Sequence, residues 1–126
     1  MVMWLRAYDE VRGLWQYFEG DDEGHVLRQV DLRGDDGTPV TAASLDEVLR
    51  FQERADIATM SRYERRYGLV AEGRLTGWEE SPGAGAISAE AFETVWLEAR
   101  RTLGATPTRP EADPGADPEA DPGAGR

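Results

Sequence analysis

The chain contains a single histidine, and a run of acidic residues lies just before it in the sequence, separated from it by Gly24. His25 follows the run Asp21–Glu23, so a neighbouring carboxylate could orient its imidazole to act as a general base. The same residues are also typical of an acidic turn followed by the solvated first residue of a strand. An acidic cleft around His25, in a small enzyme or ligand-binding protein, is therefore the alternative interpretation of function.

Other patterns for catalysis or cofactor binding are missing from the sequence. There is no cysteine and no Gly-x-Ser-x-Gly elbow, and the Gly83–Gly85 stretch lacks the spacing of a phosphate-binding loop. A calcium loop starting at Asp31 would have Arg33 at its third position and Ala42 at its twelfth, so that pattern fails too. We therefore predict no catalytic residue, no metal site and no cofactor, and we expect a non-enzymatic protein.

Aromatic residues alternate with acidic turns in a way that is typical of a binding surface. On the strand Leu14–Glu19, Trp15 and Tyr17 share one face. A partner could cover this face, with the aromatic rings as anchors, or further helices of the chain could cover it instead. The predicted partner-binding residues are Trp15, Tyr17, Asp21, Asp22, Glu23, Asp35, Asp36 and Trp78.

Short runs rich in aromatic and β-branched residues predict an antiparallel meander of three to four strands. The turn Gly34–Gly37 is a strong hairpin signal, and Pro39 indicates an edge strand or a strand start. With the helices below packed mainly on one face, the fold class is α+β. The predicted strands are Val2–Tyr8, Leu14–Glu19, His25–Arg33, with Val26, Val30 and Leu32 on its core face, and Thr38–Ala43.

Two patterns predict helices after the meander. Ser44 and Glu47 form a capping box, which predicts that a helix begins there. We predict two consecutive helices, Leu45–Arg54 and Ile57–Tyr67, with a bend near Asp56; one long helix is the competing interpretation. The stretch Ile87–Gly104 predicts a closing helix. Ser88 is its N-cap, and its apolar face consists of Phe92, Val95, Trp96, Ala99 and Leu103.

Composition limits the class of protein and of partner. The 126 residues carry a net charge of −11, which disfavours binding to nucleic acid and favours a basic protein partner. No apolar run is long enough for a membrane helix, no signal peptide is visible, and the lack of cysteine fits the cytoplasm. We expect a cytoplasmic protein that does not associate with membranes.

The chain divides into one domain and a tail. We predict a single α+β domain over residues 1–104 and an acidic, Ala-Asp-Pro-rich tail over residues 105–126. The tail contains three copies of an Ala-Asp-Pro-Gly-like unit and no large apolar residue. Such a segment cannot offset the entropy of ordering by burial, so we expect it to be disordered.

All 14 basic residues are arginine, a bias that is typical of a GC-rich genome, and we expect an actinobacterial source. The strand Trp15–Glu19, the hairpin that begins at Arg28–Arg33, and the helix start Ile87–Trp96 together resemble small bacterial domains of uncharacterised function. The resemblance implies a helix packed on a hairpin sheet and brings no catalytic motif. Small, acidic, aromatic-rich proteins of this kind also resemble immunity proteins of toxin systems. We therefore expect a protein-binding module, with inhibition of a basic toxin as one specific form.

Overall fold

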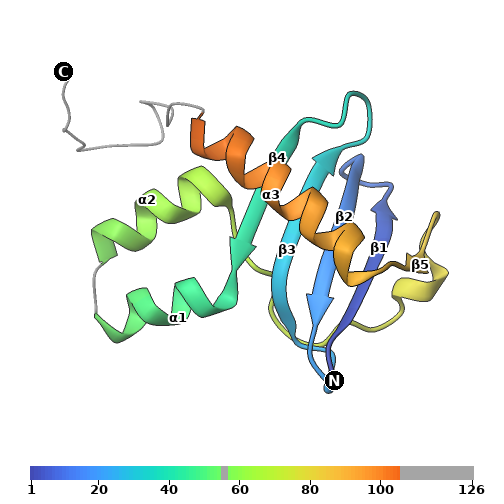
Figure 1. Ribbon diagram of the computed structural model, residues 1–126, viewed down its shortest axis with the longest axis horizontal. Helices are drawn as coiled ribbons and strands as arrows, with labels where there is room; N and C mark the ends of the chain where they lie inside the picture. Colours follow the sequence, from blue (N-terminus) through green and yellow to red (C-terminus); the bar gives the residue numbers. More distant parts are fainter. Residues whose placement is uncertain (55–56, 106–126) are drawn as a thin grey trace.

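The structure is a computed structural model, and it describes residues 1–54 and 57–105. Within these residues, five antiparallel strands form one sheet in the order β4-β3-β2-β1-β5, and α3 crosses one of its faces (Figure 1). This confirms the predicted α+β class. The strands are β1 (Met3–Asp9), β2 (Leu14–Gly20), β3 (Val26–Arg33), β4 (Pro39–Ser44) and β5 (Gly85–Ala86), and the helices are α1 (Leu45–Glu53), α2 (Ile57–Tyr67), the short 3-10 helix η1 (Trp78–Glu80) and α3 (Ala89–Ala105).

The main core lies between α3 and the sheet. Ser88 caps the helix as predicted, because its Oγ accepts a hydrogen bond from the Ala91 N–H at 3.0 Å. The apolar stripe of α3 then faces strands β3 and β4, and its Phe92 side chain is fully buried. The buried members of this core are Val30, Ala42, Phe92, Trp96 and Ala99, and Tyr17 and Leu32 pack against them.

A second, smaller core lies on the opposite face of the sheet, which we call the back face. Leu5, Phe18 and Val26 are buried there, under a segment that contributes Val70, Leu75 and Trp78. The prediction that Val26 shares a face with Val30 is therefore wrong. The register between β2 and β3 shifts at Glu19 and Gly20. Their β3 partners are Arg28 and Val26, so one extra β3 residue lies between these partners. Such a bulge reverses the inward and outward alternation of the strand.

Helices α1 and α2 lie side by side next to the β4 edge (Figure 1). The two-helix interpretation is thus confirmed, although the predicted bend near Asp56 lies outside the described residues. Only half of the predicted capping box forms. The Ser44 Oγ accepts from the Glu47 N–H at 3.4 Å, but the Ser44 N–H donates to the Tyr63 hydroxyl and not to the Glu47 carboxylate. A tertiary contact has replaced a local one.

The fifth strand and the chain ends complete the description. β5 pairs with β1 through Leu5 and Arg6, and the sequence did not predict it because two residues carry no alternation. None of the described helices is long and apolar enough to cross a membrane. Apart from Ala105, which ends α3, the predicted disordered tail lies outside the described residues.

Candidate functional site

The sheet face under α3 is only partly covered by the helix. Strand register places Tyr8 opposite Trp15, and Trp15 opposite Leu32, in one row across β1, β2 and β3. Tyr17 occupies the next row, opposite Val30, where it packs on the helix core. Tyr8 and Trp15 instead pack on each other, with ring centroids 5.1 Å apart. Both remain partly exposed.

Trp15 is the centre of this open area. The guanidinium carbon of Arg6, an exposed residue, lies 4.9 Å from the centroid of the indole ring, a cation–π distance. The loop before β5 touches the same ring. A Cβ on Gly83, where φ is +67°, would come within 2.5 Å of it, so only glycine fits at this position. The ring is thus held in place while part of it faces solvent.

A shallow pocket of about 460 Å³ continues from this row to the end of the sheet where the β1–β2 and β3–β4 turns meet. The two turns are joined by the Gly34 N–H, which donates to the Gly13 carbonyl at 2.8 Å. A Cβ on Gly34 would lie 2.8 Å from the Tyr8 hydroxyl, so a larger residue would separate the turns. The pocket is lined by Tyr8, Arg12, Gly13, Leu14, Arg33, Asp35 and Val40.

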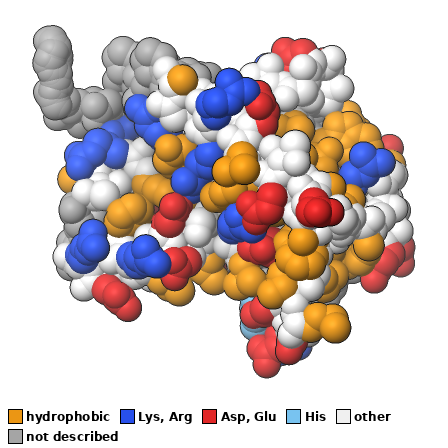
Figure 2. Space-filling model, in the orientation of Figure 1, with side chains coloured by type: hydrophobic (Ala, Val, Ile, Leu, Met, Phe, Trp, Pro, Cys, Tyr) orange, Lys and Arg blue, Asp and Glu red, His pale blue; other side chains and the backbone are white. Residues whose placement is uncertain are grey.

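The charges around the pocket are paired locally. Arg12 Nε lies 2.7 Å from a carboxylate oxygen of Asp9, and Arg33 Nη2 lies 2.7 Å from one of Asp35. The hydrogen bond from Arg33 lowers the pKa of Asp35 to about 2, so this carboxyl group is ionised at any physiological pH. Arg6, Tyr8, Trp15 and the pocket residues together form what we call the turn-end surface. Figure 2 shows hydrophobic side chains exposed over the β1–β2 side of the sheet, with charged groups among them.

The structure does not bring all the predicted partner-binding residues together. Trp15 and the turn acids Asp35 and Asp36 lie at the same end of the sheet, whereas Tyr17 is half-buried beside α3. Antiparallel pairing places the turn Asp21–Glu23 at the opposite end. Trp78 packs on the back face. Sequence reasoning had missed Arg6 and Tyr8, which the register of the first hairpin could have suggested.

The acids around His25 organise a turn. Asp21 Oδ1 accepts hydrogen bonds from the backbone N–H groups of Glu23 and His25, both at 2.9 Å. The bond from the His25 N–H is the main reason why the pKa of Asp21 is lowered. The imidazole is 42% exposed, and its Nδ1 lies 3.5 Å from Asp21 and 3.6 Å from Glu23. Among the described residues, no group of three histidine or acidic side chains is arranged to hold a metal ion.

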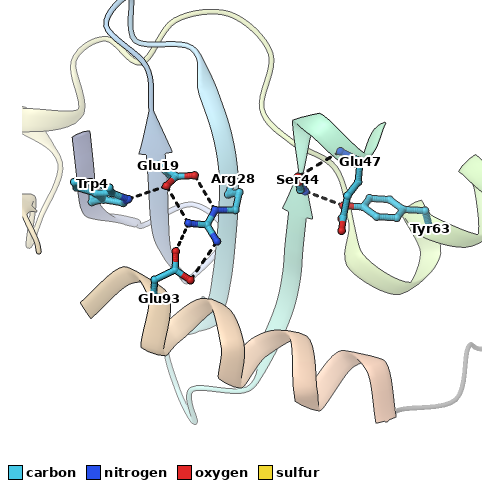
Figure 3. A network of polar contacts seen from close by, with 7 residues as sticks. All are labelled: Trp4, Glu19, Arg28, Ser44, Glu47, Tyr63 and Glu93. Atoms are coloured by element: carbon cyan, nitrogen blue, oxygen red, sulfur yellow. Dashed lines mark hydrogen bonds and ion pairs between the residues drawn. The ribbon is translucent and has the colours of Figure 1, made fainter. Parts of the chain in front are cut away.

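Two arginines, Arg28 on β3 and Arg100 on α3, have structural partners. Arg28 bridges Glu19 on β2 and Glu93 on α3, and the indole N–H of Trp4 donates to Glu19 at 2.9 Å (Figure 3). The bond from Arg28 lowers the pKa of Glu19. On the other side of the helix, Arg100 donates to the Ala42 carbonyl at 2.8 Å and pairs with Glu47 and Tyr63. These charges hold α3 on the sheet.

The structure is an α+β domain in which α3 covers part of one sheet face, and the aromatic residues Tyr8 and Trp15 remain partly exposed at one end of that face. No known family model matches the chain, and comparison with curated proteins and with solved structures finds no match either. The resemblance to small bacterial domains therefore stays a prediction.

Proposed function

We propose that this protein is a non-enzymatic, cytoplasmic protein-binding module that recognises a basic protein through the turn-end surface. Inhibition of a toxin is one specific form of this function. The observation that carries the proposal is Trp15, a partly exposed indole held by Arg6, Tyr8 and Gly83. A rigid aromatic ring loses little entropy on binding, so it is suited to be an interface anchor.

The net charge of the whole chain supports a basic partner, whereas the charges at the turn-end surface itself balance, because Arg6, Arg12 and Arg33 are offset by Asp9, Asp35 and Asp36. The chain has 25 acidic and 14 basic residues, and such an excess accelerates the approach of a cationic protein. In the view of Figure 2, many of the arginines gather over α1 and α2, away from the sheet. Of the two acidic turns, only Asp35–Asp36 adjoins the turn-end surface, so these two acids are the proposed rim charges.

The test measures the effects of the rim charges and of the Trp15 anchor on binding kinetics separately. After isolation of a partner from the native host, stopped-flow binding compares Asp36→Asn with Asp22→Asn, which removes the same charge at the opposite end of the sheet. We expect Asp36→Asn to slow association more than Asp22→Asn does, and added salt to reduce the difference. Asparagine can still accept the bond that Asp36 Oδ1 receives from the Thr38 N–H, so the turn is preserved.

The anchor should act on dissociation. Trp15→Ala should speed dissociation with little change in association, because desolvated contacts form late in docking. Leu69→Ala, which truncates an apolar residue that is 64% exposed and lies outside the turn-end surface, is the matched control. Circular dichroism establishes that both variants are folded. Wild-type binding by folded Trp15→Ala, together with equal effects of the two asparagine variants, would contradict the proposal.

The alternative, a small enzyme or ligand-binding protein with an acidic cleft around His25, is supported by the imidazole that lies near Asp21 and Glu23. Those distances are longer than hydrogen bonds, and Asp21 already accepts two backbone N–H groups. The partner-binding proposal predicts that His25→Ala leaves binding unchanged. A catalytic activity abolished by His25→Ala would favour the alternative.

A further inference from the structure

A buried acidic residue lies on the back face of the sheet, on the opposite side from α3. Asp31 on β3 is only 3% exposed. Its register partners are Gln16 on β2 and Thr41 on β4, two polar residues whose influence lowers the pKa of its carboxyl group. Gln29, two residues earlier on β3, is 5% exposed and completes this polar cluster inside an otherwise apolar layer.

Gln29 connects the acid to the segment that covers the back face. Its side-chain Nε2 lies 3.1 Å from each carboxylate oxygen of Asp31. Its Oε1 accepts a hydrogen bond from the Ala71 backbone N–H at 2.9 Å. Ala71 belongs to the segment between α2 and η1, which passes behind the sheet in Figure 1 and places Val70 and Leu75 on the second core.

The charged groups that act on Asp31 come from one end of the sheet. The positive charge of Arg12, in the β1–β2 turn, lowers the pKa of Asp31, and the Arg12 guanidinium also pairs with Asp9. Arg33 follows on the same face of β3, but its guanidinium is bound to Asp35. Neither arginine donates to the Asp31 carboxylate, whose hydrogen bonds come from the Gln29 side chain. Burial outweighs the arginine charge and raises the pKa of Asp31.

The orientation of the Gln29 amide depends on the proton state of Asp31. An ionised carboxylate only accepts hydrogen bonds, so the amide must present Nε2 to it and Oε1 to the Ala71 N–H. When a proton from solvent binds Asp31, its O–H becomes a donor. The amide can then turn its Oε1 toward Asp31, which leaves the Ala71 N–H facing an NH₂ group that cannot accept.

We propose that Asp31 and Gln29 form a protonation-dependent latch that holds the segment around Ala71 against the back face. The latch is closed when Asp31 is ionised and opens when Asp31 takes up a proton. Leu75 provides an internal reference, because its N–H donates to the Gly24 carbonyl at 2.8 Å and its bond involves no side chain of the cluster.

NMR titration of the full chain tests this inference. The Gln29 side-chain NH₂ and the Ala71 amide should shift with the same midpoint as the Asp31 carboxyl carbon. The Leu75 amide, which is bonded to the turn around Asp21, should not share this midpoint, because the pKa of Asp21 is lowered and that of Asp31 is raised. On the acid side of that midpoint, the exchange protection of the Ala71 amide should fall about fivefold, as expected for the loss of one hydrogen bond. In Asp31→Asn, the shift of Ala71 should disappear.

The wild-type titration alone can overturn the latch if the asparagine variant does not fold. An Ala71 amide that does not move while Asp31 titrates would contradict it. So would an Asp31 carboxyl carbon with no titration above the acid unfolding transition, or an Ala71 shift that persists in Asp31→Asn.

Discussion

Truncation of Trp96 should cost a large part of the stability of the domain. The side chain is 9% exposed and stacks on Phe92, with ring centroids 6.5 Å apart. The guanidinium carbons of Arg28 and Arg100 lie 5.0 and 4.4 Å from its ring centroid. Truncating a buried aromatic residue to alanine costs about 3–5 kcal/mol, and each cation–π contact adds about 0.5–2 kcal/mol. We therefore expect Trp96→Ala to lose at least about 4 kcal/mol.

Urea denaturation measures this loss. Small domains have slopes of about 1–3 kcal/mol per molar urea, so the midpoint should fall by about 2 M. Total stability of such domains is about 5–15 kcal/mol, and the variant should be close to unfolding. Leu97→Ala is the matched control, because the neighbouring Leu97 is 64% exposed and its truncation should change stability by less than about 0.5 kcal/mol. A loss below about 1.5 kcal/mol for Trp96→Ala, or equal losses in the two variants, would refute the packing of α3 described above.

Three further predictions concern charge and the tail. Because Arg28 lowers the pKa of Glu19, their ion pair stabilises the fold at pH values above the ordinary carboxyl pKa, and this stabilisation is lost as pH falls. Glu19→Gln should therefore cost about 1–3 kcal/mol of stability at neutral pH and nothing in acid. Urea midpoints measured as a function of pH test this. Burial raises the pKa of Asp31, so ionisation of its carboxyl group destabilises the folded state as pH rises. The urea midpoint of Asp31→Asn should therefore increase relative to that of the wild type between acid and neutral pH. A difference in urea midpoint that does not change with pH would contradict the raised pKa. Deleting residues 106–126 should leave the melting temperature unchanged, because the sequence has no large apolar residue after Leu103; a drop of many degrees would show that the tail contributes to the fold.

Much of the local structure could be predicted because its signals are local. Ser88 and the apolar stripe through Phe92 and Trp96 identify α3, and the turn around Gly37 identifies the β3–β4 hairpin. Caps, turn residues and periodicity act over about one to four residues of chain, so they can be recognised without knowledge of the packing. Strand alternation likewise placed Trp15 and Tyr17 on one face.

The candidate site was predicted only in part. Alternation indicates which residues share a face, but it does not indicate which part of that face a helix will cover. Tyr17 packs on the core under α3 and Trp15 does not, although both side chains remain partly exposed. The two acidic turns looked like one rim in the sequence, yet antiparallel pairing sends successive turns to opposite ends of a sheet.

By itself, the sequence determined the order of the first four strands and the three α-helices, the N-cap residues Ser44 and Ser88 and the faces of β2, since each depends on neighbours within a few residues. Tertiary structure alone decided that a bulge would turn Val26 to the back face, that Tyr63 would take the place of Glu47 at the Ser44 N–H, and that Asp31 would be buried beside Gln29. These outcomes depend on contacts between residues far apart in the chain. A hydrogen bond or a buried carboxylate is specified by both partners and by the shape between them, and a pattern in one segment contains only one of those partners.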